Sequence, residues 1–483
     1  MKADEVQRAL ECSRPFGVAE DLVGRRVDRE AVLARTVVLS AGEGVLTKVE
    51  AQWCMVDSLR LLSRVVGKLE VVLPDDAPTS FVAAVNDAVE AVWSQGTVKL
   101  VSASGANWSG ATSVLCIHAA HNRAPTATVV GSDGWIAYVG ARPHMGVAAG
   151  PNAMAALMAA SIGAAEVFKQ VYGVPHEIAP PLGNEYFNLF TGDDSDPEQG
   201  PGLPVDIELP DALLLGAGAI GNAIASLLTR LRPQGRLVIV DKDVFAPENR
   251  GTCMLLDRDD WVGQPKADTL AKFLEGSEGL SVKGWKGRIE DASGADGVDL
   301  SSIDLVFGAL DDVSARRAVQ KLWPSVLVDG AINARGATSI ARRFVDADVA
   351  CLRCTFPEPK KKVSDLTSDE RRLHANRKAI CAQLDGEATQ EAFGLDLEDG
   401  FRPSVPFVAS ASAAMVVAQS LKAVLWPEKR LAHQLQIESL FLGFSTAQKL
   451  RRATVATCEC VKRRELILGV IAARLKGGRS LTT

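Results

Sequence analysis

Short apolar runs alternate with longer stretches of helical periodicity along most of the chain. In the second half, the apolar run ALLL is followed by the glycine-rich loop GAGAIG, a helical pattern and a second apolar run. This order is that of a βαβ unit, and its continuation predicts an α/β fold with a largely parallel sheet. The expected elements are strands at 212–215, 237–240, 305–310 and 326–329 and helices at 222–231 and 407–425.

The first half repeats this order more faintly, with a strand expected at 36–39, a helix at 48–66 and a strand at 69–74. Three further segments match the second half in the same order. They are TSVLCIHAA with IDLVFGALDD, TATVVGSDGWIAYVGARP with SVLVDGAINARGATSIARRF, and AMAALMAASIGAAEVFKQVYG with PFVASASAAMVVAQSLKAVLW. The ordered matches predict a duplicated domain. The alternative is two unrelated α/β domains that share buried strands and Ala-rich helices.

The two halves differ where ligand chemistry is expected. The first has SAGEG in place of GAGAIG and nothing like the acidic turn that follows Val240, so a duplicated first half would carry a degenerate nucleotide site. Acidic residues, Gly and Pro replace apolar periodicity between 192 and 206, which indicates a linker. The predicted division is a degenerate domain at 1–196, a linker at 197–208 and a second domain at 209–483, which contains an extra charged segment at 355–404.

Length, composition and charge narrow the class of protein. The 483 residues are about twice the length of a typical domain, which agrees with two units. Fifty-three basic and 59 acidic residues give a formal charge of −6, which argues against nucleic acid or an anionic membrane as a partner. The N-terminal residues lack the apolar core of a signal peptide, and the longest apolar stretches are interrupted by polar residues. We expect a cytoplasmic protein whose nine cysteines are reduced.

The loop GAGAIG fits the pattern G-x-G-x-x-G with Gly216, Gly218 and Gly221. Glycines let the backbone turn tightly and approach a phosphate, and the following helix offers unpaired N–H groups at its positive end. Asp241 ends the second strand about 20 residues later, where a carboxylate commonly accepts hydrogen bonds from ribose hydroxyls. This context predicts nucleotide binding, and so far it fits an NAD-dependent enzyme as well.

Polar and charged residues cluster in the stretch after this strand. An enzyme that holds a triphosphate and stabilises a departing pyrophosphate needs such groups, whereas a dehydrogenase has little use for them. Two carboxylates close a further strand, where oxygen ligands suit Mg²⁺. The alternatives are a helix cap for Asp312 and a solvated surface for Asp243 and Lys266. The residues concerned are Asp243, Asn249, Arg250, Lys266, Asp311 and Asp312.

From about 213 to 462 the chain resembles the ubiquitin-activating (E1) superfamily that includes the bacterial proteins ThiF and MoeB. The resemblance rests on GAGAIG, the D-x-D of Asp241 and Asp243, the pair Asn249 and Arg250, VGQPK ending at Lys266, ALDD at Asp311 and two cysteine pairs. Enzymes of this superfamily adenylate the C-terminal Gly carboxylate of a ubiquitin-like protein with Mg·ATP. The resemblance implies two Rossmann-like ThiF/E1-type domains in one chain, of which the first is degenerate.

The resemblance also implies roles for single residues. Asp241 would bind the ribose and Asp311 the Mg²⁺, while Arg250 and Lys266 would act on the phosphates and, with Asp311, take part in catalysis. The family usually has N-x-x-R where this chain has adjacent Asn249 and Arg250, which implies either a shorter turn or a different function for the arginine. The implied ATP-binding residues are Gly216, Gly218, Gly221, Asp241, Asp243, Asn249, Arg250, Lys266, Asp311 and Asp312.

The cysteine pairs resemble the structural zinc site of the same family. Cys351 and Cys354 are followed by Phe-Pro, and a strand-like pattern at 434–455 leads to Cys458 and Cys460, whose C-x-C spacing is tighter than the usual C-x-x-C. Four thiolates suit tetrahedral Zn²⁺ and would tie the end of the chain to the sheet. The alternative is four unrelated buried cysteines.

Cys381 lies in the extra segment at 355–404, the crossover region that holds the thioester-forming cysteine of E1 relatives. A nucleophilic cysteine needs exposure and a lowered pKa, to which Arg377 and Lys378 would contribute. The structural alternative is a cysteine packed beneath a short helix. Cys253 is the rival thiol, although it lies in the expected phosphate-binding stretch.

As a whole, the resemblance implies a monomeric pseudo-dimer similar to eukaryotic E1 and to the E1 (BilD-type) of bacterial ubiquitin-like conjugation antiviral systems. ATP, Mg²⁺ and Zn²⁺ are the implied cofactors, and a ubiquitin-like protein and an E2-like conjugating enzyme are the implied partners. An N-terminal arginine reaches the phosphates from the partner half in E1 dimers, and Arg26 and Arg29 are candidates. The open alternatives are a ThiF/MoeB-like sulfur-carrier adenylyltransferase, an NAD-dependent oxidoreductase and a non-catalytic scaffold.

Overall fold

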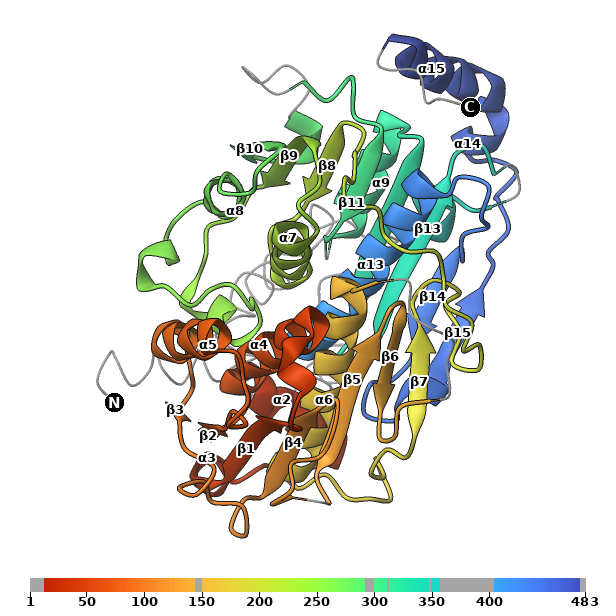
Figure 1. Cartoon of the computed structure of the whole chain (residues 1–483). Coiled ribbons are helices and arrows are strands. Elements are labelled where there is room, and N and C mark those ends of the chain that lie inside the picture. The colour runs from red at the N-terminus through yellow and green to blue at the C-terminus, as the bar shows by residue number, and fades with distance from the viewer. Residues whose placement is uncertain are drawn as a thin grey trace, which may run out of the picture.

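Two sheets with flanking helices make up the protein, and Figure 1 shows the first in red to yellow and the second in green to blue. The computed structural model describes residues 13–124, 126–143, 150–291, 299–310, 312–346, 349–356 and 404–477. Asp311, Cys381 and nearly all of the segment at 355–404 lie outside them.

The first sheet has the strand order β3-β2-β1-β4-β5-β6-β7. Pairings from β3 to β5 are parallel, and β6 runs antiparallel to both β5 and β7. The strands are β1 (Thr36–Ala41), β2 (Lys68–Val71), β3 (Thr97–Leu100), β4 (Ser113–Ile117), β5 (Thr128–Asp133), β6 (Ile136–Val139) and β7 (Glu185–Asn188). The helices of this half are α2 (Ser13–Val23), α3 (Arg29–Ala34), α4 (Val49–Ser63), α5 (Thr79–Ala91) and α6 (Ala153–Tyr172).

The second sheet repeats this order as β10-β9-β8-β11-β12-β13-β14 and adds β15 at one edge. The strands are β8 (Ala212–Leu215), β9 (Gly235–Asp241), β10 (Leu280–Lys286), β11 (Leu305–Gly308), β12 (Val326–Ile332), β13 (Ala337–Arg343), β14 (Gln434–Ile437) and β15 (Ala447–Leu450). The helices are α7 (Ala219–Leu231), α8 (Lys266–Leu274), α9 (Val313–Val319), α10 (Leu352–Thr355), α13 (Pro406–Leu425), α14 (Glu459–Lys462) and α15 (Arg464–Gly477).

The matching strand orders confirm two Rossmann-like halves, as the ordered sequence matches predict. The three matched segments form β4 and β11, the hairpins β5-β6 and β12-β13, and the helices α6 and α13. The expectation of a largely parallel sheet holds from β10 to β12, whereas β13, β14 and β15 pair antiparallel. No strand was expected where β13 lies. A tight turn after β12 reverses the chain there, because the Asn333 side chain accepts hydrogen bonds from the N–H groups of Arg335 and Gly336.

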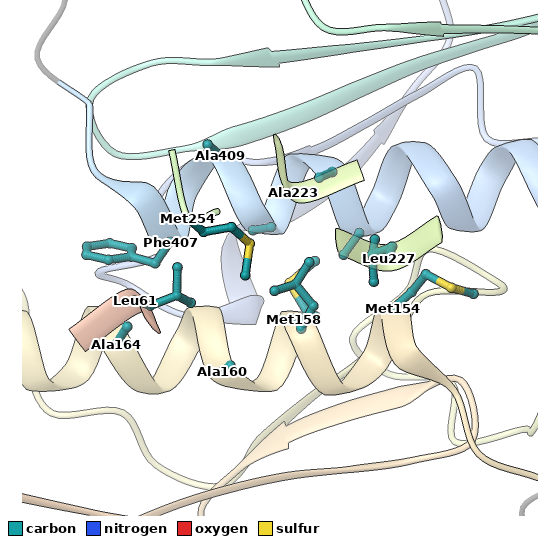
Figure 2. Packing of buried hydrophobic residues seen from close by; sticks show 14 of the residues in the cluster. Leu61, Met154, Met158, Ala160, Ala164, Ala223, Leu227, Met254, Phe407 and Ala409 are labelled. Carbon is teal, nitrogen blue, oxygen red and sulfur yellow. The ribbon is translucent and has the colours of Figure 1, made fainter. Parts of the chain in front are cut away.

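The helices α6 and α13 form the centre of the molecule. Both are long and apolar enough to cross a membrane, yet nearly all of each is buried inside the protein, as expected for core helices. Figure 2 shows Met154 and Met158 of α6 pointing toward α13, with Leu227 of α7 and Met254 in the layer between the two helices, and Phe168 of α6 contacts Phe407 of α13 edge to face. Residues of both halves therefore belong to one continuous hydrophobic core.

Two lysines cross between the halves in a reciprocal way. Lys169 of α6 donates its Nζ proton to the carbonyl of Phe441 at 3.0 Å, and Lys422 of α13 donates to the carbonyl of Phe190 at 2.6 Å. Burial lowers the pKa of Lys422 to about 8. A two-fold symmetric dimer makes each contact twice in this manner, so the pair supports an origin by duplication of a dimeric ancestor.

Buried ion pairs also join the halves. The fully buried side chain of Arg64, just after α4, donates to Asp257 Oδ1 at 2.7 Å and to the carbonyl of Cys253 at 3.2 Å. Arg230 of α7 pairs with buried Asp57 of α4 in the same layer. The first half thus holds the segment at 253–257, which directly follows the expected phosphate-binding residues.

Candidate functional site

The loop between β8 and α7 depends on its glycines for two close backbone approaches. Gly216 has φ +98°, and a Cβ there would lie 2.5 Å from the carbonyl oxygen of Ala309. A Cβ on Gly221 would lie 2.1 Å from the carbonyl oxygen of Gly216. Buried Asn222 donates from its side chain to the carbonyls of Ala217 at 3.0 Å and Gly218 at 3.2 Å, which fixes the loop to the helix.

Gly218 behaves differently from the other two glycines. It has φ −77°, and no described atom lies within 4 Å of where its Cβ would be. It is also the N-cap of α7, and among the described residues no side chain caps this helix. Open space therefore adjoins the positive end of the helix, which is the arrangement that accepts a phosphate.

Asp241 lies at the end of β9, beside this loop. Its Oδ2 accepts a hydrogen bond from the Ala217 N–H at 2.6 Å, and its Oδ1 accepts one from the Asp243 N–H at 2.8 Å. Burial raises the pKa of this carboxyl, while Lys266 and the two N–H groups oppose the rise. The carboxylate is thus held at the carboxyl edge of the sheet, where dinucleotide and mononucleotide sites lie in such folds.

Lys266 is the first residue of α8 and is buried, so it is not part of a solvated surface. Its N–H donates to the carbonyl of Asp243 at 3.0 Å, and its Nζ lies 3.9 Å from Asp243 Oδ2. The Asp243 side chain is more than half exposed. Lys266 therefore places a positive charge near Asp241 and Asp243.

Asn249 and Arg250 share one short 3-10 turn, Pro247–Gly251. The Asn249 side-chain oxygen accepts from the Ala246 N–H at 2.9 Å and thereby caps the turn. Arg250 pairs with Asp259, whose side chain is almost fully exposed. Asn249 thus caps the turn and Arg250 is held by an ion pair, and their roles toward ATP stay predictions.

Of the two expected Mg²⁺-side carboxylates, Asp311 lies outside the described residues. Asp312 is the N-cap of α9, and its Oδ1 accepts from the N–H groups of Ser314 at 2.7 Å and Ala315 at 3.3 Å. The structural alternative that the sequence offered for Asp312 is therefore present. A role of either carboxylate in metal binding stays a prediction.

A buried ion pair that the sequence gave no reason to single out stands beside this segment. Arg316 of α9 lies with its Nε 3.0 Å from Oδ2 of Asp329, and it donates to the carbonyls of Leu310 and, at 3.1 Å, of Gly330. Burial raises the pKa of Asp329 to about 6, although Arg316 opposes this. Arg316 thereby ties Leu310, which lies between β11 and residue 311, to β12.

The first half reaches the site through α2, which packs against the turn Pro247–Gly251. Burial raises the pKa of the Cys253 thiol, while Lys266 and Arg14 of α2 oppose the rise, so Arg14 is within electrostatic range of this region. Arg29, one of the two expected arginines, lies instead over the ring of Phe16, 5.0 Å from its centroid. Cys253 is fully buried, which makes it a poor nucleophile.

The four paired cysteines come together, as their spacing predicts. Their sulfur atoms all lie within 4.8 Å of one another, and the nearest neighbours are 3.6 to 3.7 Å apart. Zn–S bonds of about 2.3 Å give a sulfur tetrahedron with edges of about 3.8 Å, so the cluster fits Zn²⁺. The Val455 N–H donates to Cys354 Sγ at 3.3 Å, a contact that supports a bound thiolate. The cluster consists of Cys351, Cys354, Cys458 and Cys460.

Comparison with known protein families shows which family has the sequence of the second half of the chain. The model of the ThiF family matches residues 206–460, which is more than half of the chain. The chain belongs to the ThiF family. It is thereby a member of the ThiF/MoeB/E1 adenylyltransferase superfamily, for which ATP and Mg²⁺ are the implied cofactors.

Two curated proteins are similar to this ThiF-family chain. An uncharacterized protein, y4jF, of Sinorhizobium fredii is 27% identical over 366 residues, which cover 73% of this chain and 66% of that protein. A ubiquitin-activating enzyme E1-like protein of Saccharomyces cerevisiae is 27% identical over 152 residues, which cover 31% of this chain and 23% of that protein. The matched parts thus span less than two thirds of either relative.

Among solved structures, that of Escherichia coli MccB with ATP is 16% identical and covers 52% of this chain and 66% of that chain, with a TM-score of 0.37. The structure of PaaA is also 16% identical and covers 47% of this chain and 69% of that chain, with a TM-score of 0.31. A likeness of this degree supports no statement about activity.

Proposed function

We propose that this chain activates a ubiquitin-like protein by adenylating its C-terminal glycine carboxylate with Mg·ATP. The observation that carries the proposal is the convergence of the open space at Gly218, the held carboxylate of Asp241 and the buried cation of Lys266 at one edge of the second sheet. These groups have the charges that ribose hydroxyls and phosphates require. A hydride-transferring NAD enzyme would leave Lys266 without a task, and family membership disfavours it.

In the proposed first step, a carboxylate oxygen of the carrier attacks the α-phosphorus of ATP. The bond between the α-phosphorus and the bridging oxygen breaks, and pyrophosphate leaves, so that the carrier becomes an acyl-adenylate. Negative charge on the phosphates is stabilised by Lys266 and the N-terminus of α7, with Asn249 and Arg250 positioned at the adjoining turn. Mg²⁺ held by Asp311 would neutralise further phosphate charge.

In the proposed second step, a thiolate attacks the acyl carbon, AMP leaves and a thioester forms. Cys381 is the proposed nucleophile and passes the carrier to an E2-like conjugating enzyme. Its rival Cys253 is fully buried and has a raised pKa, which supports Cys381. The proposed setting is a cytoplasmic bacterial conjugation system of the antiviral BilD-type group, in which the chain acts as a monomeric pseudo-dimer.

The first half is proposed to have lost its own nucleotide site while keeping the dimer-like interface. Glu43 lies between the two glycines of its loop, where a carboxylate would repel phosphate. One acidic contact that the sequence interpretation missed does persist: Asp76, which follows β2, accepts a hydrogen bond from the Gly44 N–H at 2.5 Å. Asp76 thus contacts the loop of the first half, as Asp241 contacts the loop after β8.

The test combines ATP–pyrophosphate exchange with gel analysis, using as probe a ubiquitin-like protein that ends in Gly-Gly. We expect exchange that requires the carrier and is lost in Lys266→Ala, and a carrier adduct that a thiol reductant removes. Cys381→Ala should keep exchange and lose the adduct, whereas Cys253→Ala, the control, should keep both. An adduct that persists in Cys381→Ala would refute that nucleophile, and absence of exchange would refute adenylation of this carrier.

The second candidate is a ThiF/MoeB-like sulfur-carrier adenylyltransferase, which the same adenylation site favours equally. It predicts exchange with a carrier that ends in Gly-Gly but no transfer to an E2 cysteine. Adding an E2-like protein to the charged enzyme separates the two, because only the E1 function moves the adduct to the second protein.

A further inference from the structure

The strand β13 carries an arginine whose environment is unusual. The Arg342 side chain is 5% exposed, and its Nε, Nη1 and Nη2 are all buried with no hydrogen-bond partner among the described residues. Its guanidinium lies over the ring of Phe344, 4.6 Å from the centroid. A cation–π contact of this kind is weak compared with the cost of burying an unpaired charge.

That contact alone does not balance the burial of a full positive charge. Burying a cation without a partner is strongly destabilising, and each unsatisfied buried polar group in a native protein requires an explanation. In the described part of the chain, no carboxylate forms an ion pair with Arg342. A compensating negative charge must therefore come from another kind of group.

The four-cysteine cluster lies beside Phe344 and can supply such charge. Phe344, on which Arg342 stacks, packs in the same apolar cluster as Cys351 and Cys460. Buried His433 also lies near these cysteines, but its ring is engaged by the Ala350 carbonyl and the Arg452 N–H and offers no negative charge.

We propose that Arg342 is the buried counter-charge of a tetrathiolate zinc centre formed by the four cysteines. Four thiolates around one Zn²⁺ carry two net negative charges, and a buried guanidinium offsets one of them. Arg342 is then a positioning and charge-compensating residue of the metal centre, and it touches neither ATP nor the carrier.

The variant Arg342→Met tests this, because Met keeps most of the apolar volume and removes the charge. We expect the affinity for zinc, measured by competition with a chromophoric chelator, to fall between about tenfold and 100-fold. In zinc-free protein the same change should raise the melting temperature, because it removes an uncompensated buried charge. Arg342→Lys should recover most of the zinc affinity.

Arg343→Met is the matched control. Arg343 is the next residue of β13, so its side chain points to the opposite face, where it lies near Asp346 and the Pro427 carbonyl. This variant should bind zinc as the wild type does. The readout is zinc affinity, so the result is independent of whether ATP–pyrophosphate exchange occurs.

Three results would overturn the proposal. Reduced wild-type protein that takes up less than one equivalent of zinc would remove the centre itself. An Arg342→Met variant with wild-type zinc affinity would remove the counter-charge role. A melting temperature that falls equally in zinc-free and zinc-bound Arg342→Met would show that the side chain only packs.

Discussion

Alanine variants of Gly218 and Gly221 should affect different properties of the protein, because the added methyl group meets a different environment at each position. The first should weaken nucleotide binding and the second should destabilise the fold. At Gly221 the new carbon would lie 2.1 Å from the carbonyl oxygen of Gly216, whereas carbon and oxygen normally keep about 3.3 Å apart. The backbone must move by about 1 Å, at a cost of about 1–3 kcal/mol or more. The higher helix propensity of alanine offsets at most about 1 kcal/mol of this cost.

At Gly218 the same methyl group meets no described atom within 4 Å, and the φ of −77° is one that alanine adopts without strain. Reduced freedom of the unfolded chain favours Ala by about 0.4–1 kcal/mol, and its weaker N-cap preference offsets this. We therefore expect Gly218→Ala to leave stability nearly unchanged. If a phosphate occupies the open space, the methyl group should weaken Mg·ATP binding about tenfold, or about 1.4 kcal/mol.

The assay pairs thermal melting with calorimetric titration of Mg·ATP for both variants. Gly218→Ala should have the melting temperature of the wild type and bind ATP more weakly. The melting temperature of Gly221→Ala should be lower than that of the wild type by about 2 °C or more. A Gly218→Ala variant that binds ATP like the wild type would refute the phosphate site. A Gly221→Ala variant of wild-type stability would refute the tight packing of loop on helix.

Three further predictions concern buried charges and the metal centre. Asp257→Asn leaves fully buried Arg64 without a carboxylate and should lower the free energy of unfolding by about 3 kcal/mol. Arg64→Met should lower it less, because Asp257 still pairs with Arg60 and accepts from the Trp93 N–H. A melting temperature that is lower in Arg64→Met than in Asp257→Asn would contradict this. The pKa of Asp329, raised from 3.8 to about 6, means that the folded state binds the proton more tightly, so its ionisation costs stability as pH rises through this range. We therefore expect the free energy of unfolding of Asp329→Asn, measured in urea, to rise by about 3 kcal/mol relative to that of the wild type between about pH 4 and pH 7. A difference between the two proteins that does not change with pH would argue against this. Chelation of zinc under reducing conditions should lower the melting temperature of wild-type protein but not of Cys458→Ser, and equal sensitivity would count against a structural metal.

The order of elements was predictable from the sequence because it depends on local periodicity. Runs such as ALLL and the helix after GAGAIG have the spacing of a strand and a helix, and the same spacing recurs in both halves. The repeat followed from matched order, which the two sheets confirm. The strand β13 was not among those expected, because its antiparallel pairing with β12 depends on the turn at Asn333, which apolar periodicity does not reveal.

Ion pairs between residues far apart in the sequence could not be predicted either. Arg64 meets Asp257 and Arg316 meets Asp329 through tertiary packing, and a single arginine in an apolar stretch gives no periodic signal. Arg342 is a further example, since its burial is invisible without the sheet. The cysteine cluster was predictable because paired spacing marks metal ligands, even when the pairs are far apart in the sequence.

We propose that one half of this chain binds ATP for adenylation and that the other half does not. Equilibrium dialysis of the full chain with radiolabelled Mg·ATP measures this. Asp241→Ala and Asp76→Ala are compared, since each carboxylate accepts a hydrogen bond from the loop after β8 or after β1. We expect one ATP per chain, at least tenfold weaker binding in Asp241→Ala, and no change in Asp76→Ala. Two ATP molecules per chain, or an effect of Asp76→Ala as large as that of Asp241→Ala, would contradict it.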